Sequence, residues 1–170
     1  MKKFALILTI IMSLAVSKNA IAQGTIVDVA VGNKDFSTLV TALKAADLVG
    51  ALQGEGPFTV FAPTNDAFAK IDSNTLASLL EEKNQKALAN ILTYHVISGK
   101  IAATDVVSAL EKGNGTVELK ALNGQVLTVV QKDGKIWLKD LNGNYSEIVA
   151  TDVMGSNGVI HVINTVVMPN

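Results

Sequence analysis

The sequence of 170 residues contains no cysteine. That absence excludes disulfide bonds, a thiol nucleophile, a lipid-modified N-terminal cysteine and metal sites built from thiolates. Arginine is absent as well, so every basic residue is a lysine. Arginine is the residue whose planar guanidinium binds phosphate and guanine through two parallel hydrogen bonds. We therefore expect no nucleic acid among the partners, and stability has to come from ordinary packing.

Long apolar runs are missing beyond the first 22 residues. There, a Lys-Lys pair precedes an apolar run over residues 4–16, and an Ala-Ile-Ala tripeptide offers a small-residue cleavage site. The run is shorter than the roughly 20 residues that a membrane helix needs. We predict a signal peptide over residues 1–22, export to the periplasm, the cell surface or the medium, and no transmembrane segment after cleavage. An uncleaved signal anchor is the alternative.

The remaining residues, 23–170, suffice for one domain that buries about two-thirds of its unfolded surface. No repeat, low-complexity tract or long linker divides them. The whole chain has a formal net charge of −1, and removal of the leader's lysines makes the mature chain more acidic. The pattern predicts one compact domain, and it leaves the oligomeric state open.

The first half of this domain has a helical pattern. Phe36, Leu39, Val40 and Leu43 have the spacing of one buried helix face, and Asp35 stands where an N-cap belongs. Apolar stripes within residues 76–80 and 87–92 predict two further helices that pack together.

A short strand is predicted between these helices. Residues 58–61 are apolar or β-branched, and the following Pro63 restricts the backbone before it, which fits the end of a strand. Thr64 can then cap the next helix through its side chain.

The second half changes to short β-favouring runs after a helical turn around residues 105–110. The predicted strands occupy residues 116–122, 125–131, 135–139, 147–153 and 159–167. Asn-Gly and Asp-Gly pairs at 123–124, 133–134, 142–143 and 157–158 can supply the positive φ angles of tight hairpins. Helices followed by antiparallel strands predict an α+β fold.

No motif for catalysis, cofactors or metals emerges from the sequence. His95 and His161 lack a second ligand at helical spacing, so we expect no transition-metal site. The segment 155–158 lacks the spacing of a nucleophile elbow and is interpreted as a hairpin turn. The paired acids Glu81 and Glu82 lie in a polar, solvated stretch. We predict that the protein is not an enzyme and has no catalytic, cofactor-binding or metal residues.

Three segments together resemble the fasciclin domain family. Residues 56–68 read GPFTVFAPTNDAF, residues 92–99 read LTYHVISG, and residues 156–163 read SNGVIHVI, with VMP following at 167–169. Their order and spacing agree with the family, so the resemblance covers essentially the whole mature chain. A small exported domain of this kind looks bacterial.

The resemblance implies a wedge-shaped antiparallel β-sandwich with several helices in the N-terminal half. It also implies a non-enzymatic module for cell adhesion or extracellular matrix interaction, with a cell-surface or matrix protein or glycan as partner. In animal members, a Tyr-His region and an Asp-Ile-Met stretch are associated with integrin-dependent adhesion. Here they correspond to Tyr94, His95, Asp152, Val153 and Met154, which are our candidate interaction residues.

Structural roles are the alternative for these residues. An aromatic ring and an imidazole directly after a helix more often lock it to a sheet, and the same argument applies to His161 inside an apolar strand. Two departures from the family pattern stand out: Asn164 replaces the usual Asp, and the hairpin over residues 139–148 looks longer than usual. That hairpin is a candidate for specificity.

Two other functions are weighed against adhesion. An apolar interior framed by mixed turns is compatible with a periplasmic binding protein for a small molecule or glycan. An unrecognised hydrolase is the third hypothesis, with Ser156 or His95 as its test positions.

Overall fold

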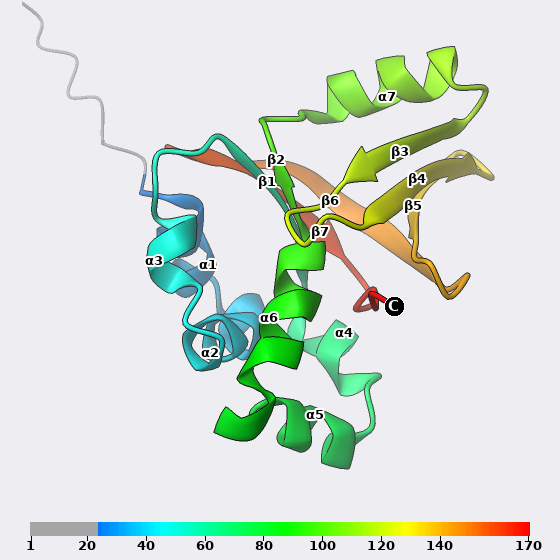
Figure 1. Cartoon of the computed structure of the whole chain (residues 1–170). Coiled ribbons are helices and arrows are strands. Elements are labelled where there is room, and N and C mark those ends of the chain that lie inside the picture. Colours follow the sequence, from blue (N-terminus) through cyan, green and yellow to red (C-terminus); the bar gives the residue numbers. More distant parts are fainter. Residues whose placement is uncertain (1–23) are drawn as a thin grey trace, which may run out of the picture.

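The computed structural model describes residues 24–170, and the predicted signal peptide lies outside them. Figure 1 shows the arrangement of the elements. In chain order they are α1 (Ile26–Gly32), η1 (Lys34–Phe36), α2 (Ser37–Ala45), α3 (Val49–Leu52), β1 (Phe58–Pro63), α4 (Asn65–Ala69), α5 (Ser73–Leu79), η2 (Glu82–Asn84), α6 (Gln85–Tyr94), β2 (Val96–Ser98), α7 (Ala103–Lys112), β3 (Thr116–Lys120), β4 (Val126–Lys132), β5 (Lys135–Lys139), β6 (Tyr145–Gly155) and β7 (Gly158–Ile163).

The predicted helix face over residues 36–43 is buried as expected, because Phe36, Leu39, Val40 and Leu43 all belong to the core. The predicted cap at Asp35 is wrong. The helix begins one turn earlier as η1, where the Asn33 side chain accepts a hydrogen bond of 3.0 Å from the backbone N–H of Asp35. A short polar side chain at the true start satisfies the free N–H group, as N-caps do.

The strands form one curled, seven-stranded sheet in the order β2-β1-β7-β6-β5-β4-β3. Strands β1 and β7 run parallel, and the other pairs are antiparallel. The ends of the sheet approach each other, since a bridge joins Ile97 to Ala121 and the N–H of Leu122 donates to the carbonyl of Val96 at 2.8 Å. The α+β class is confirmed. Most neighbouring strands pair antiparallel as predicted, and the parallel pair β1–β7 is the exception. The described strands follow one another in one curled sheet, so the β-sandwich that the resemblance implied is not confirmed.

The predicted strands over residues 116–139 agree with β3, β4 and β5 to within two residues, whereas β6 is longer and β7 ends earlier at Ile163. Asp133 and Gly134 both have positive φ, as a tight hairpin requires. The expectation of positive φ at 157–158 is wrong. Gly158 is needed there for space, because a Cβ atom would lie 2.2 Å from the carbonyl oxygen of Phe58 on the parallel strand.

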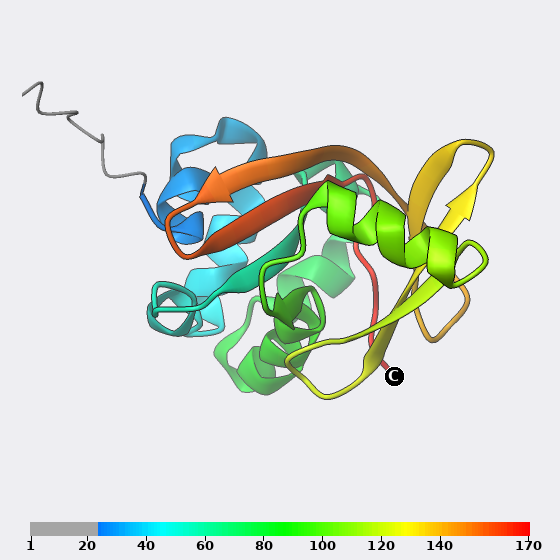
Figure 2. The ribbon, with the colours of Figure 1, turned by 90° about the horizontal axis from the view of Figure 1, so that it is seen from above.

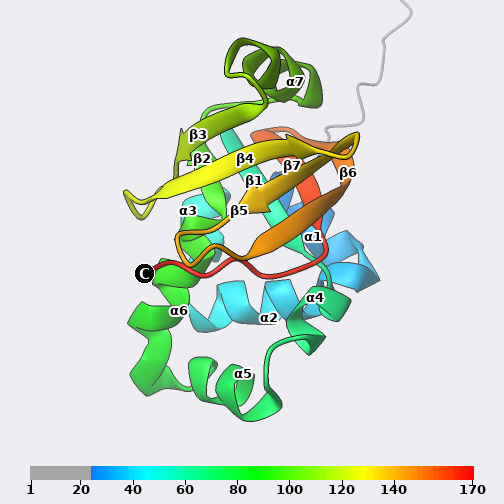
Figure 3. The same cartoon turned by 90° about the vertical axis from the view of Figure 1, so that its right-hand side faces the viewer.

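Two buried clusters fill the molecule. The first joins the N-terminal helices and α6 to one side of the central strands, and the second joins α7 to strands β3–β5. Figures 1 and 3 show α7 on the opposite side of the sheet from α4, α5 and α6. Viewed from above, α1–α3 lie at the far end of the molecule from the β4–β5 hairpin (Figure 2).

Candidate functional site

The three segments that carry the family resemblance meet at the strands β2, β1 and β7. In the parallel pair, Phe61 lies opposite His161, and their rings are 5.6 Å apart. On its other side, the N–H of Phe61 donates to the carbonyl of His95 at 2.8 Å. Phe61 has no exposed surface. The two histidines of the motifs therefore flank one buried phenylalanine in the centre of the fold.

His95 joins the end of α6 to the C-terminal segment. The backbone N–H of Val167 donates to its Nε2 at 3.2 Å, so Nδ1 carries the proton and donates to the carbonyl of Ile91 at 2.8 Å. Burial lowers the pKa of His95 to about 4, against the smaller opposing effect of the bond to Ile91. The imidazole is therefore neutral at pH 7, and its two hydrogen bonds link α6 to the C-terminal segment.

Tyr94 is fully buried beside it, and its hydroxyl donates to the carbonyl of Val126 on β4 at 2.9 Å. Burial raises the pKa of Tyr94, and the negative charge of Asp140 raises it further. The ring thus stays neutral and fastens α6 to the hairpin strands. For both residues of the Tyr-His motif, the geometry matches the structural alternative.

Asp152 occupies an irregularity in β6, where the pairing with β7 shifts register between Ala150 and Val153. Its φ is +58°, and its carboxylate accepts from the N–H of Ala103 at 2.9 Å, at the first turn of α7. Its own N–H donates to Nδ1 of His161 at 3.4 Å, and Nε2 of His161 donates to the carbonyl of Ile101 at 2.8 Å. This group ties the start of α7 to the sheet.

The remaining candidates on β6 are half-buried, and Val153 packs against the helical core. Within residues 24–170, no hydrogen bond or ion pair connects Tyr94 or His95 with Asp152. The structure therefore places the candidates in two separate groups. Asp152, Val153 and Met154 keep partial exposure, whereas Tyr94 and His95 are internal.

Two further polar residues stabilise the fold through buried hydrogen bonds, and these roles were not predicted from the sequence. Asn157 is buried; its side chain accepts from the N–H of Ile26 at 2.9 Å and donates to the carbonyls of Leu52 and Gly54 at 2.8 and 2.7 Å. We interpreted Asn157 as a turn residue, because an Asn-Gly pair between apolar runs is the usual hairpin signal. Its contacts are more than 100 residues away in the chain, so no local pattern reveals them.

Asp140 is the second such residue, at 4% exposure. Its carboxylate accepts from the backbone N–H groups of Asn142, Asn144 and Met168, and from the side-chain amide of Asn144. These bonds close the loop of residues 140–144 and attach it to the C-terminal segment. The Asp-x-Asn-Gly-Asn sequence was the available signal, because Asp accepts readily from the backbone two residues ahead.

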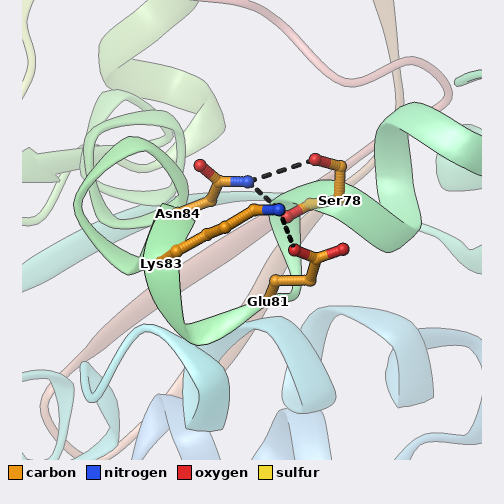
Figure 4. Close-up of polar contacts among 4 residues, drawn as sticks. All are labelled: Ser78, Glu81, Lys83 and Asn84. Carbon is orange, nitrogen blue, oxygen red and sulfur yellow. Dashed lines mark hydrogen bonds and ion pairs between the residues drawn. The ribbon is translucent and has the colours of Figure 1, made fainter.

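The turn between α5 and α6 offers little for binding. Figure 4 shows the turn between α5 and α6, where Lys83 and Glu81 form an exposed ion pair of 2.6 Å and the amide of Asn84 donates to Ser78. These polar groups satisfy one another, and exposed ion pairs contribute little. Across residues 24–170, no cluster of three or more metal-ligating side chains occurs, and no helix is long and apolar enough to cross a membrane.

The outer face of strands β3–β6 differs from the rest of the sheet, because no helix covers it (Figure 3). Cross-strand pairing fixes which side chains share this face. One row runs through Thr116, Val130, Trp137 and Glu147, and the next runs through Glu118, Thr128, Lys139 and Tyr145. The alternate residues of these strands, such as Leu127, Val129 and Leu138, are fully buried on the inner face.

Two adjoining hollows lie on this outer face. The larger, of about 560 Å³, extends over β3–β5 and the loop after β5, and the smaller, of about 210 Å³, lies next to Trp137. Tyr145 lines both hollows and is 48% exposed. The longer hairpin noted in the sequence, residues 139–148, thus forms one wall of this surface. We call the surface the hairpin face and define it by the two cross-strand rows and the loop of residues 140–144.

Comparisons with known proteins agree with this fold. The sequence profile of the Fasciclin domain matches residues 34–169. The chain is 52% identical over 145 residues to Protein sll1483 of Synechocystis sp., covering 85% of this chain and 73% of that protein. It is 40% identical over 147 residues to transforming growth factor-beta-induced protein ig-h3 of Sus scrofa, covering 86% of this chain and 20% of that protein.

Cell surface glycolipoprotein MPB83 of Mycobacterium bovis is 35% identical over 153 residues, which cover 87% of this chain and 62% of that protein. Among solved structures, a FAS1 domain pair from the insect cell adhesion molecule Fasciclin I matches with a TM-score of 0.73 at 19% identity, covering 84% of this chain and 50% of that chain. The chain belongs to the fasciclin domain family.

Proposed function

We propose that the protein is an exported, non-enzymatic interaction module that attaches to a partner at the cell surface or in the surrounding matrix. Two related proteins carry names that point this way, a cell surface glycolipoprotein and an insect cell adhesion molecule. The observation that carries the proposal is that the polar residues fall into two groups, one buried and one on the surface. Those of the family motifs bond internally, and the uncovered polar surface with exposed aromatic area lies on the hairpin face.

Loss of the protein from the producing cells tests this function. A deletion strain should attach or aggregate less than its parent, and the purified protein should bind the surface of the deleted cells. A variant with Tyr145→Ala should fail to restore attachment, because it removes the exposed ring that lines both hollows of the hairpin face. Unchanged attachment together with no binding of the purified protein would contradict the proposal.

A soluble binding protein for a small molecule or glycan is the second candidate. The hollow of about 560 Å³ favours it, because its volume lies within the range of small-molecule sites. A ligand that binds the folded state raises the unfolding temperature by mass action. A thermal shift with a soluble ligand, in cells whose attachment does not depend on the protein, would favour this function over adhesion.

A further inference from the structure

The hairpin face has an aromatic platform on β5 and β6, towards one end of its cross-strand rows. Tyr145 on β6 lies opposite Lys139 and diagonal to Trp137 on β5, and it lines both hollows. The ammonium of Lys139 lies 5.9 Å from the centre of the Tyr145 ring, on its face. Diagonal neighbours of this kind are within reach of aromatic side chains. Exposed ring surface is thus concentrated at one place on the face.

Polar groups surround this platform within the larger hollow. Thr116 and Thr128 supply hydroxyl groups, Glu118 supplies a carboxylate, and Asn142 supplies an amide from the loop after β5. Hydroxyls and amides both donate and accept, whereas a carboxylate accepts. The indole N–H of Trp137 is buried and has no acceptor among the described residues, so it is not accessible to a ligand on this face. The hydroxyl, amide and carboxylate groups thus place hydrogen-bond donors and acceptors beside the ring surfaces.

The charges on the face oppose a strongly charged ligand. Its two rows contain one lysine, Lys139, and two acids, Glu118 and Glu147. Lys135, next to the face at the start of β5, is paired with Glu147 at 2.7 Å, and arginine is absent from the chain. A sulfated or phosphorylated ligand would require a surplus of positive charge or a bidentate guanidinium. Neither is present on this face. The charge pattern favours an uncharged ligand.

The apolar surface also falls short of a typical protein interface. The core of such interfaces is depleted in charged residues and enriched in aromatic and arginine anchors. Here the row with Tyr145 contains Lys139 and Glu118, and the row with Trp137 contains Glu147. Apolar and polar side chains alternate without forming a continuous apolar centre. A ligand with a small apolar face and many hydroxyl groups fits this alternation better.

We propose that the hairpin face is a binding surface for a neutral oligosaccharide, whose sugar rings stack on Tyr145 and Trp137 while their hydroxyls bond to Glu118, Thr128 and Asn142. A sugar ring has one C–H face for the aromatic rings and hydroxyls at its rim for the polar groups. The face spans four strands, about 14 Å across at strand spacing, so it accommodates more than one ring. This inference rests on the proposed interaction function and names the chemistry of the partner.

The chain contains a single tryptophan, so its fluorescence reports on this face directly. The purified protein is titrated separately with cellohexaose, chitohexaose and mannohexaose, and with heparin as a charged probe. At least one neutral oligosaccharide should change Trp137 emission with saturation, and heparin should not. In Tyr145→Ala, affinity should fall about tenfold or more, whereas Tyr145→Phe should keep most of it, because the ring face is retained.

Val31→Ala provides the matched control, because Val31 is 59% exposed on α1, at the far end of the molecule. Its affinity should equal that of the parent. Binding to producing cells is measured with the same samples. If the protein binds the cells but no neutral oligosaccharide changes Trp137 emission or competes, the glycan proposal is overturned and the interaction function stands. If the protein binds neither, both are overturned.

Discussion

The central strands and the hairpin strands of this protein use polar residues in opposite ways. Around β2, β1 and β7, the side chains of His95, His161 and Asn157 are buried and form hydrogen bonds with backbone groups of distant segments. On the hairpin face, Thr128, Lys139 and Tyr145 point outward, and the opposite side of the same strands forms core. The family motifs lie in the first region, and the second region contains none of them.

This difference separates the residues that define the fold from the residues that are accessible to a binding partner. A buried polar residue without its partner costs about 1–3 kcal/mol, so the motif positions tolerate few replacements. Outward residues on a strand are free of that constraint, and substitutions there usually change stability by no more than about 0.5 kcal/mol. The hairpin face can therefore vary in chemistry while the domain keeps its fold. This division should appear in the stability of variants and in its dependence on pH.

The largest effect is expected at Phe61, between the two motif histidines. Phe61→Ala should destabilise the protein by about 3–5 kcal/mol, because it removes a fully buried ring and leaves a cavity. Urea unfolding followed by circular dichroism measures the change. Tyr145→Ala is the surface counterpart and should cost less than about 0.5 kcal/mol. Equal losses in the two variants would erase the proposed difference between the regions.

The buried imidazole of His95 predicts a loss of stability in acid. Its pKa is about 4 in the folded protein and 6.5 in the unfolded chain, so the folded state binds fewer protons between these values. The contribution is complete above pH 6.5 and is lost as the pH falls towards 4. It amounts to about 3 kcal/mol at about 1.4 kcal/mol for each pH unit.

His95→Gln isolates this contribution, because the carboxylates that titrate in the same range remain in both proteins. Unfolding free energies of the two are compared at intervals from pH 7 to pH 4. The parent should lose about 3 kcal/mol more than the variant over this range. Parallel pH profiles would mean that His95 does not stay neutral in the folded state.

A smaller effect is expected at Asp152, which combines a positive φ with the cap of α7. Asp152→Ala removes the acceptor for the N–H of Ala103 and should cost about 1–2 kcal/mol. Asp152→Asn keeps an acceptor and tolerates the same backbone conformation, so it should cost less. Thermal unfolding of both variants measures the difference. If both variants lost the same stability, the carboxylate charge, and not the hydrogen bond to Ala103, would account for the contribution of Asp152.

The helices and hairpin strands were predictable because their signals are local. The apolar spacing at Phe36–Leu43 and the Asp133-Gly134 turn each act within a few residues. The parallel pairing of β1 and β7 was not predictable in this way, because the paired residues lie about a hundred positions apart. For the same reason the role of Asn157 was missed, because its partners lie more than 100 residues away. Asp140 had a local signal in the Asp-x-Asn-Gly-Asn sequence, and only its bond to the N–H of Met168 depends on the tertiary fold.

For the candidate site, the sequence predicted Tyr94, His95 and Asp152–Met154 through the family resemblance. The buried contacts of Tyr94, His95 and Asp152 give these residues structural roles, and their part in binding stays a prediction. The long hairpin at residues 139–148 was noted as a candidate for specificity, and it forms a wall of the hairpin face. The face as a whole was missed, because its members come from four strands and alternate with core residues.

The most direct test compares two variants in one binding measurement. Purified Tyr145→Ala and Asp152→Asn are applied to the surface of producing cells that lack the protein, beside the parent and the Val31→Ala control. Our account predicts that Tyr145→Ala loses about tenfold or more in affinity and that Asp152→Asn binds like the parent. Full binding by Tyr145→Ala together with loss of binding by folded Asp152→Asn would contradict it, and would place the partner at the motif residues.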